Sequence, residues 1–136
     1  MKYLALMASC TLISTGTLAD DVSDTNRLLC SQGQVMLCLH GADCAYVPPA
    51  EVATPQFVII DTREKTVSTT RASGDGRSSD INNLTREGGL IMAQGRHDER
   101  AFSFVIDEAT GTFPGSVASD GYTINAFGAC TDAKVN

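Results

Sequence analysis

Residues 100–130 read RAFSFVIDEATGTFPGSVASDGYTINAFGAC, and this stretch decides the fold because it holds three strand candidates and two turns. In residues 101–106 the large apolar side chains fall at every second position, which places them on one face of a β-strand. Residues 107–111 supply an aspartate that starts a type I turn and a glycine that tolerates a positive φ. The dipeptide 120–121, Asp-Gly, is a second hairpin signal. Because 122–127 alternates again, the stretch predicts a three-stranded antiparallel meander.

Shorter apolar runs precede this meander and are separated by turn residues. The further strand candidates are 28–30, 34–39, 56–61, 65–70, 81–85 and 89–93. Between them we expect a hairpin turn at Gln32-Gly33, irregular loops at 40–54, 73–80 and 95–99, and one helical turn at 49–53. Residues 20–26 are polar and are expected to be frayed. The sequence predicts an all-β fold, a small antiparallel barrel or sandwich of about seven to nine short strands.

The first residues point to export from the cytoplasm. Residues 1–19 contain Lys2, an apolar run and small residues at the end, as a secretory signal peptide does. A membrane anchor is disfavoured because serine and threonine dilute the run. A lipoprotein at Cys10 is disfavoured because the apolar segment before it is short. We therefore expect 1–19 to be a signal peptide and 20–136 to form a single β domain that is periplasmic or secreted.

Four cysteines remain after Cys10 is removed with the signal peptide. An even number of cysteines in an exported chain predicts disulfides, here two bonds with three possible pairings. We favour Cys38 with Cys44, which closes a local loop, and Cys30 with Cys130, which joins the first strand to the last. On chain entropy the long link stabilises the domain by about 4–5 kcal/mol and the short link by about 2–3 kcal/mol.

A metal site is the alternative use of these cysteines. It would combine Cys38, His40, Asp43 and Cys44. Zinc sites usually repeat a C-x2-C pair, and the spacing here does not. No calcium-loop or phosphate-loop motif is complete elsewhere in the chain. We therefore predict no metal and no cofactor.

The charge balance disfavours two classes of partner. The formal net charge is −6, and removal of Lys2 with the signal peptide makes it more negative. An acidic domain is repelled by phosphate backbones and by anionic lipid. We therefore expect neither nucleic-acid binding nor stable membrane insertion.

Catalytic motifs are sparse, and we predict that the protein is not an enzyme. A serine or cysteine nucleophile needs a base, and the chain has two imidazoles, His40 and His97. His97 lies in the expected loop 95–99 and His40 lies inside the cysteine loop, so surface or structural roles are favoured for both. A hydrolase that uses His40 or His97 is the third hypothesis, after two binding functions.

The aromatic residues lead to those two binding functions. Most of them stand at alternating strand positions, where we expect them to fill a small core. Four could instead line a ligand cavity, as in lipocalin-like carriers: Phe57, Phe102, Phe104 and Tyr122. The leading hypothesis is a non-enzymatic binding module that engages an envelope or secreted protein partner, as an inhibitor or accessory factor, through an edge strand or a loop. The alternative is a carrier of a small apolar ligand.

The chain also resembles a group of short, uncharacterised exported β proteins of bacteria. The resemblance rests on three N-terminal cysteines, on the strand 57–61, on residues 102–111 and on the sequence FGACT at 127–131. It implies an envelope location and a cysteine-stapled β fold. It supplies no activity and no site residue.

Overall fold

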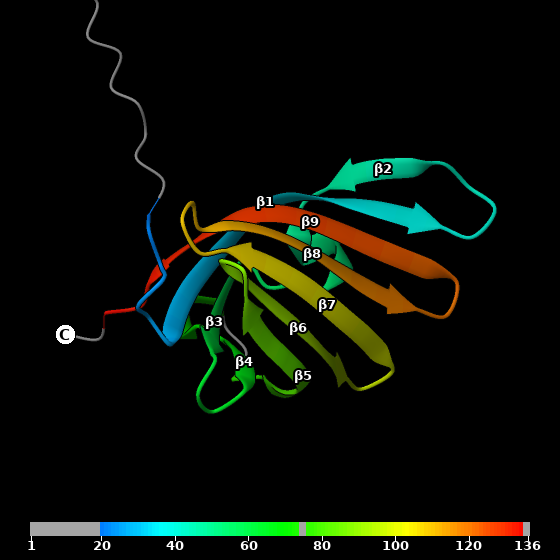
Figure 1. Cartoon of the computed structure of the whole chain (residues 1–136). Coiled ribbons are helices and arrows are strands. Elements are labelled where there is room, and N and C mark those ends of the chain that lie inside the picture. Colours follow the sequence, from blue (N-terminus) through cyan, green and yellow to red (C-terminus); the bar gives the residue numbers. More distant parts are fainter. Residues whose placement is uncertain (1–19, 74–75, 135–136) are drawn as a thin grey trace, which may run out of the picture.

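A computed structural model describes residues 20–73 and 76–134, and its strands form one antiparallel sheet that closes on itself (Figure 1). The strands are β1 (Arg27–Leu39), β2 (Cys44–Val47), β3 (Phe57–Asp61), β4 (Thr66–Thr69), β5 (Ser78–Glu87), β6 (Leu90–His97), β7 (Arg100–Asp107), β8 (Thr112–Ser119) and β9 (Tyr122–Asp132). The predicted signal peptide, 1–19, lies outside the described residues.

Closure depends on the pairing of the first strand with the last. β1 pairs with β9 along nearly its whole length, and its other edge pairs first with β3 and then with β2. Strands β1 and β3 to β9 therefore form an eight-stranded barrel, and β2 extends it outside as an extra strand. The all-β prediction is confirmed, and the architecture is a barrel and not a sandwich.

The hairpin predicted at Gln32-Gly33 is wrong, because β1 runs straight through it. Gln32 pairs with Gly128 and Val35 pairs with Ala126, so two residues of β1 face a single residue of β9. This is a β-bulge, which shifts the inward–outward alternation by one residue. Gln32 and Val35 consequently both face the interior. Glycine is required at position 128, because a Cβ there would lie 1.9 Å from a carbonyl oxygen of β1.

Three of the predicted loops contain strand residues. β2 lies within the expected loop 40–54, β5 begins at Ser78 and β6 continues to His97. Gly95 looked like a turn residue, but its missing side chain makes room for a ring on the next strand. A Cβ at Gly95 would lie 2.4 Å from Cζ of Phe102. Because β6 continues to His97 and β7 begins at Arg100, the turn that connects them is only two residues long.

The turns of the quoted meander form as predicted. Asp107 starts the first one, where its Oδ1 accepts hydrogen bonds from the N–H groups of Ala109 and Thr110. Gly111 follows with a φ of 65°, and Gly121 in the second turn has a φ of 80°. Both values fall in the left-handed region that glycine adopts without steric cost.

The helical turn expected at 49–53 is present as the 3-10 helix η1 (Pro49–Val52), and a second short one, η2 (Arg71–Ser73), precedes β5. Neither is long enough or apolar enough to span a membrane, and no other helix lies in 20–73 or 76–134.

Both predicted disulfides are confirmed. Cys30 and Cys130 are joined across the β1–β9 pair, with a sequence separation of 100. Cys38 and Cys44 are joined across the β1–β2 pair, with a separation of 6. Disulfides form and persist in oxidising compartments, so the fold is suited to an extracytoplasmic environment.

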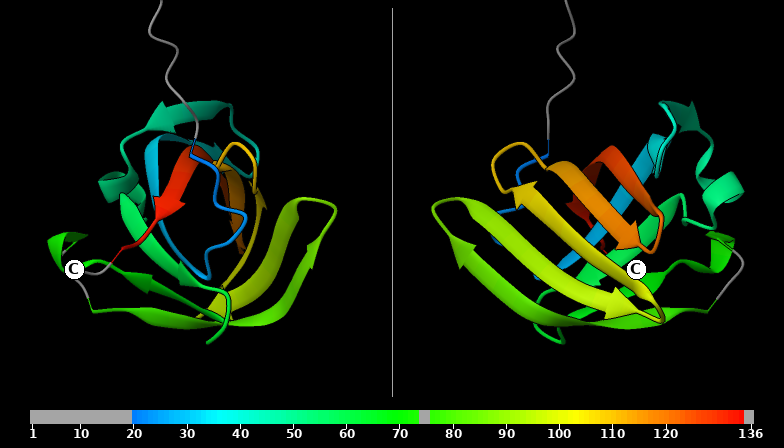
Figure 2. Two further views of the ribbon diagram at one scale, coloured as in Figure 1. Left: turned by 60° about the vertical axis from the view of Figure 1, so that its left-hand side comes forward. Right: turned by 90° about the vertical axis from the view of Figure 1, so that its right-hand side faces the viewer.

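The polar segment before β1 is not frayed but closes one end of the barrel (Figure 2). Val22 is 1% exposed and packs into the main core cluster. Its N–H donates to the carbonyl of Glu108 at 2.7 Å. The guanidinium of Arg86 donates to the Glu108 carboxylate and to the carbonyls of Ser23 and Thr25. This network explains why a polar segment is held against the barrel.

Candidate functional site

A cavity of about 160 Å³ lies inside the barrel, toward the end that carries the β6–β7 turn. The Val22 segment closes the other end, near the β7–β8 turn. The walls are mainly apolar side chains from β3, β7, β8 and β9: Val58, Ile60, Phe102, Phe104, Phe113, Val117, Ile124 and Ala126. A third of the His97 side chain is exposed, so the cavity communicates with solvent at this end.

Three basic side chains line the mouth of the cavity: Arg77, His97 and Arg100. No aspartate or glutamate is present among the described residues that line it. The cavity therefore presents positive charge inside a protein whose formal net charge is −6. In a cleft with low-dielectric walls such a charge difference produces a local field that attracts anions.

Arg100 is positioned by the start of β7. Its Nη1 donates to the carbonyl of Val52, at the end of η1, at 3.3 Å. Its guanidinium carbon lies 5.7 Å from the centroid of the Tyr122 ring, in a cation–π arrangement. A guanidinium has five N–H donors, so these contacts fix the side chain without using most of its hydrogen-bonding capacity.

Arg77 is held just before β5 by the neighbouring strand β4. Its backbone N–H donates to Oγ1 of Thr69 at 3.1 Å, and its carbonyl accepts the Thr69 N–H at 2.9 Å. Its Nη1 donates to the carbonyl of Ala53 at 3.3 Å. Arg77 and Arg100 thus bind adjacent carbonyls at the end of η1, which lies at the mouth of the cavity.

His97 is the last residue of β6. Its Nδ1 lies 2.8 Å from Oγ of Ser79, which also lines the cavity. Its Nε2 lies 3.5 Å from a carboxylate oxygen of Asp98, whose side chain is 85% exposed. The expectation that His97 is a solvated loop residue is therefore wrong, because the imidazole lies in the cavity wall.

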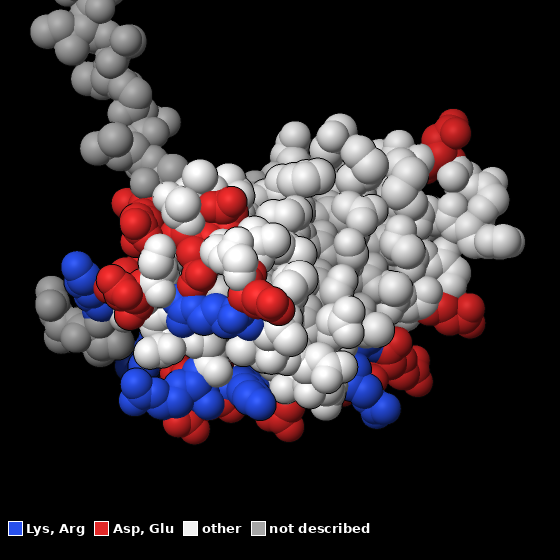
Figure 3. All heavy atoms as spheres, viewed as in Figure 1, with Lys and Arg blue, Asp and Glu red and all other residues white. Residues whose placement is uncertain are grey.

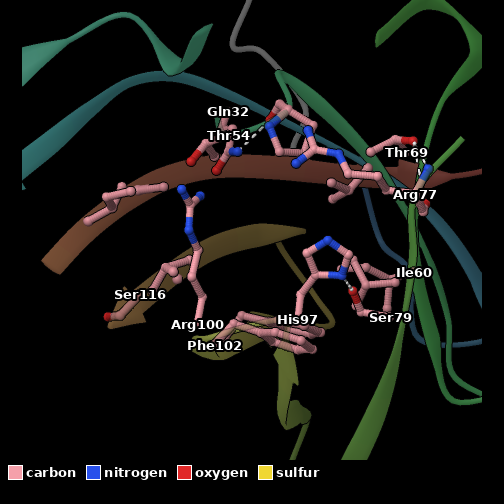
Figure 4. A pocket seen from close by; sticks show the side chains of 18 of the residues that line it. Gln32, Thr54, Ile60, Thr69, Arg77, Ser79, His97, Arg100, Phe102 and Ser116 are labelled. Atoms are coloured by element: carbon pink, nitrogen blue, oxygen red, sulfur yellow. Dashed lines mark hydrogen bonds between the residues drawn. The ribbon is translucent and has the colours of Figure 1, made fainter. Parts of the chain in front are cut away.

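Gln32 faces the same space from the bulge in β1. It is 8% exposed, and its Nε2 donates to the carbonyl of Pro55. Figure 4 shows Arg100 and His97 extending from the side of the cavity where Phe102 lies, and Gln32 and Thr54 on the facing side. The polar groups thus surround the cavity from several strands.

The four proposed ligand-lining aromatics divide into two pairs. Phe102 and Phe104 lie in the cavity wall, with stacked rings whose centroids are 6.1 Å apart. Phe57 and Tyr122 lie outside the lining, and Tyr122 instead packs under Arg100. Phe113 also lines the cavity and contacts Phe104 edge-on at 5.5 Å.

Other candidates from the sequence lie away from this cavity. His40 is exposed in the turn after β1, and its backbone N–H donates to the Gly121 carbonyl. Cys38 and Cys44 are bonded to each other, which leaves neither thiolate as a metal ligand. Within 20–73 and 76–134 no three His, Cys, Asp or Glu side chains form a group that could hold a metal ion.

A second surface is notable for its lack of charge. Figure 3 shows an uncharged face over β1, β2, β8 and β9, whereas the acidic and basic side chains gather elsewhere in that view. Tyr46 on β2 and Phe127 on β9 are 63% and 70% exposed. Phe127 is an exception to the expectation that the aromatic residues fill the core, because the alternation of β9 directs it outward. β2 itself pairs with β1 alone among the described strands.

The geometry defines a class: a disulfide-stapled, eight-stranded antiparallel barrel with an internal cavity and a basic mouth. Comparisons with protein-family models, with curated proteins and with solved structures found no match to this chain.

Proposed function

We propose that this protein is a carrier or receptor that binds a small, mainly apolar molecule inside its barrel. The observation that supports it is the cavity of about 160 Å³ with walls of valine, isoleucine and phenylalanine. An engineered apolar cavity of about 150 Å³ stays dry and takes up benzene. A single ring or a chain of about six carbons fits a space of that order.

The apolar walls alone would give modest affinity. Burial of six methylene-sized groups contributes about 5 kcal/mol at about 0.8 kcal/mol each. That free energy corresponds to a Kd on the order of 0.1–1 mM. A carrier that works below this concentration needs further interactions, and the polar groups at the mouth are available to supply them.

Toluene, followed by amide chemical shifts in a titration, tests the cavity as a binding site. We expect saturable shifts at residues that line the cavity, with a Kd on the order of 0.1–1 mM. Ala126→Leu adds three carbons at a cavity-lining position and should abolish these shifts. Ala129→Leu, on the exposed side of the same strand, is the matched control and should leave them intact. Shifts that are absent, or equally retained in both variants, would contradict the proposal.

Chemistry on the ligand is not part of this proposal. In a serine hydrolase a buried carboxylate holds the imidazole that activates the serine. The Asp98 carboxylate is exposed and lies 3.5 Å from Nε2 of His97, beyond ordinary hydrogen-bond distance. The hydrogen bond between Ser79 and His97 is the observation that favours the hydrolase alternative. Hydrolysis of a p-nitrophenyl ester that is abolished by Ser79→Ala would revive it.

Engagement of a protein partner, the leading hypothesis from the sequence, stays a second proposal. The uncharged face with Tyr46 and Phe127 supports it, because exposed aromatic residues are enriched at interfaces. We propose a periplasmic or secreted location, which the two disulfides favour. Crosslinking in the native envelope, with the wild-type protein and with Phe127→Ser, tests this face. If the two captured the same stoichiometric partner equally, this face would be excluded as the docking surface.

A further inference from the structure

We infer that the molecule bound in the barrel is a small amphipathic carboxylate, whose head group lies against Arg100 and His97 and whose apolar body lies against Phe102 and Phe104. This inference rests on the proposed function and adds the chemical class of the ligand. It comes from the way polar and apolar side chains are ordered along the β6–β7 pair.

The register of β6 and β7 orders these side chains from the mouth to the interior. Residues two apart on a strand share a face, and directly paired residues have Cβ atoms about 5 Å apart. From the mouth inward the pairs on the cavity face are His97 with Arg100, Gly95 with Phe102, Ala93 with Phe104 and Ile91 with Ile106. A ligand aligned with this face would thus meet the basic groups His97 and Arg100 first and the rings of Phe102 and Phe104 next. The Ile91–Ile106 pair lies beyond the cavity lining, in the packed core.

Gly95 makes room beside the head-group position. Because it lacks a side chain, the Phe102 ring lies across the β6 backbone, where a Cβ at position 95 would be 2.4 Å from Cζ of Phe102. The ring is thereby held in the cavity wall directly below His97 and Arg100. Figure 4 shows both basic side chains extending past this ring into the cavity.

Arg100 has no carboxylate partner among the described residues that line the cavity. Elsewhere in the barrel Arg86 forms an ion pair with Glu108, a side chain that is 12% exposed. Arg100 instead contacts a neutral carbonyl and the ring of Tyr122. The planar guanidinium matches a carboxylate with two parallel N–H donors, and such charge-assisted bonds are stronger than neutral ones. A bound carboxylate would supply the missing negative charge.

Arg77 and Gln32 complete the mouth from the facing side. Both line the cavity, and each donates to a carbonyl in the segment that follows η1, at Ala53 and Pro55. They hold this segment over the barrel end. The mouth thus carries hydrogen-bonding side chains on two facing sides.

The test compares hexanoate with 1-hexanol, which have the same chain length and differ in charge. Titration calorimetry at neutral pH and low salt should show hexanoate binding at least tenfold more tightly to the wild-type protein. Arg100→Gln should reduce this ratio to about one, since it removes the charge. Arg96→Gln is the matched control, because Arg96 is exposed on the same hairpin and lies outside the lining. It should preserve the ratio.

Two further measurements keep the test decisive if Arg100→Gln does not fold. Raising the salt concentration on the wild-type protein should reduce the preference for hexanoate, because salt screens a partly exposed charge pair. Arg100→Lys, which keeps the charge but not the planar fork, should retain part of it.

The outcomes separate this inference from the function on which it rests. Binding of toluene and hexanol with no preference for hexanoate would overturn the carboxylate and leave the apolar carrier standing. No binding of any of the three would overturn both. A clear preference for hexyl phosphate over hexanoate would show that the head-group class is wrong.

Discussion

Removal of the Cys30–Cys130 disulfide should cost far more stability than removal of Cys38–Cys44. In the chain-entropy model a loop of about 100 residues is worth about 4.7 kcal/mol at 25 °C, and one of about six residues is worth about 2.2 kcal/mol. The observed separations are 100 and 6. Cys30 and Cys130 are also 1% and 4% exposed, so alanine at both would leave a small void that adds about 1 kcal/mol.

The assay is urea denaturation of two double variants, C30A/C130A and C38A/C44A, each of which keeps the other disulfide. Domains of this size are stable by about 5–15 kcal/mol, so C30A/C130A should be marginal or unfolded at 25 °C and C38A/C44A should remain folded. The m-value of C30A/C130A, if it folds, should exceed that of the wild type, because its unfolded chain is less constrained.

A particular pattern of results would refute this reasoning. If both variants lost the same stability, loop length would not govern the effect, and local strain or packing would have to explain it. If C38A/C44A lost more unfolding free energy than C30A/C130A, the β1–β2 pair outside the barrel would stabilise the fold more than closure through β1 and β9 does.

Three other substitutions test separate parts of the structure. Gly95→Ala should destabilise the protein by about 1–3 kcal/mol in thermal melts and weaken toluene binding, because the new methyl group displaces the Phe102 ring. Arg86→Ala should cost about 2–4 kcal/mol, since it leaves the Glu108 carboxylate without its partner, and hydrogen exchange at the Val22 amide should accelerate more than exchange in the barrel. Phe127→Ser should change stability by less than about 0.5 kcal/mol, because the ring is exposed; a larger loss would mean that the ring packs on the barrel.

The features predicted correctly from the sequence are those that depend on neighbouring residues. The two hairpins of the quoted meander follow from an aspartate and a glycine at fixed offsets, and both form. The long-range Cys30–Cys130 disulfide is predictable for a different reason, since four cysteines allow only three pairings and the local Cys38–Cys44 link leaves one. Alternation within 101–106 likewise placed its inward face correctly.

The errors concern residues whose conformation depends on distant partners. Gly33 lies between two apolar runs, and a turn and a bulge look alike in such a pattern. A bulge forms instead of a turn because Gln32 pairs with Gly128, which is far away in the sequence. The polar neighbours of Val22 predict a frayed segment, whereas contacts with Arg86 and Glu108 hold that segment in place.

The candidate site was only partly predictable for the same reason. Phe102 and Phe104 were proposed as lining residues from alternation alone. Arg77 and Ser79 occur in a polar run, 73–80, that resembles a solvated loop. That run instead pairs with β4 and extends the β5–β6 hairpin, which brings Ser79 beside His97. The sequence nevertheless contains a signal for this site. Arg100 continues the alternation of Phe102 and Phe104, which predicts that its charge lies on the same inward face of the strand.

The pairing of β1 with β9 also has a consequence for the synthesis and folding of the chain. A polypeptide that emerges from the ribosome N-terminus first exposes β1 long before its partner strand has been made. Until β9 has been synthesised, the edge of β1 that will pair with it has unsatisfied backbone hydrogen-bonding groups and can pair with other nascent chains. Contacts between residues this far apart in sequence also form slowly. Newly made protein should therefore depend on holding chaperones, and a truncation that lacks the last dozen residues should precipitate instead of accumulating as a partial barrel.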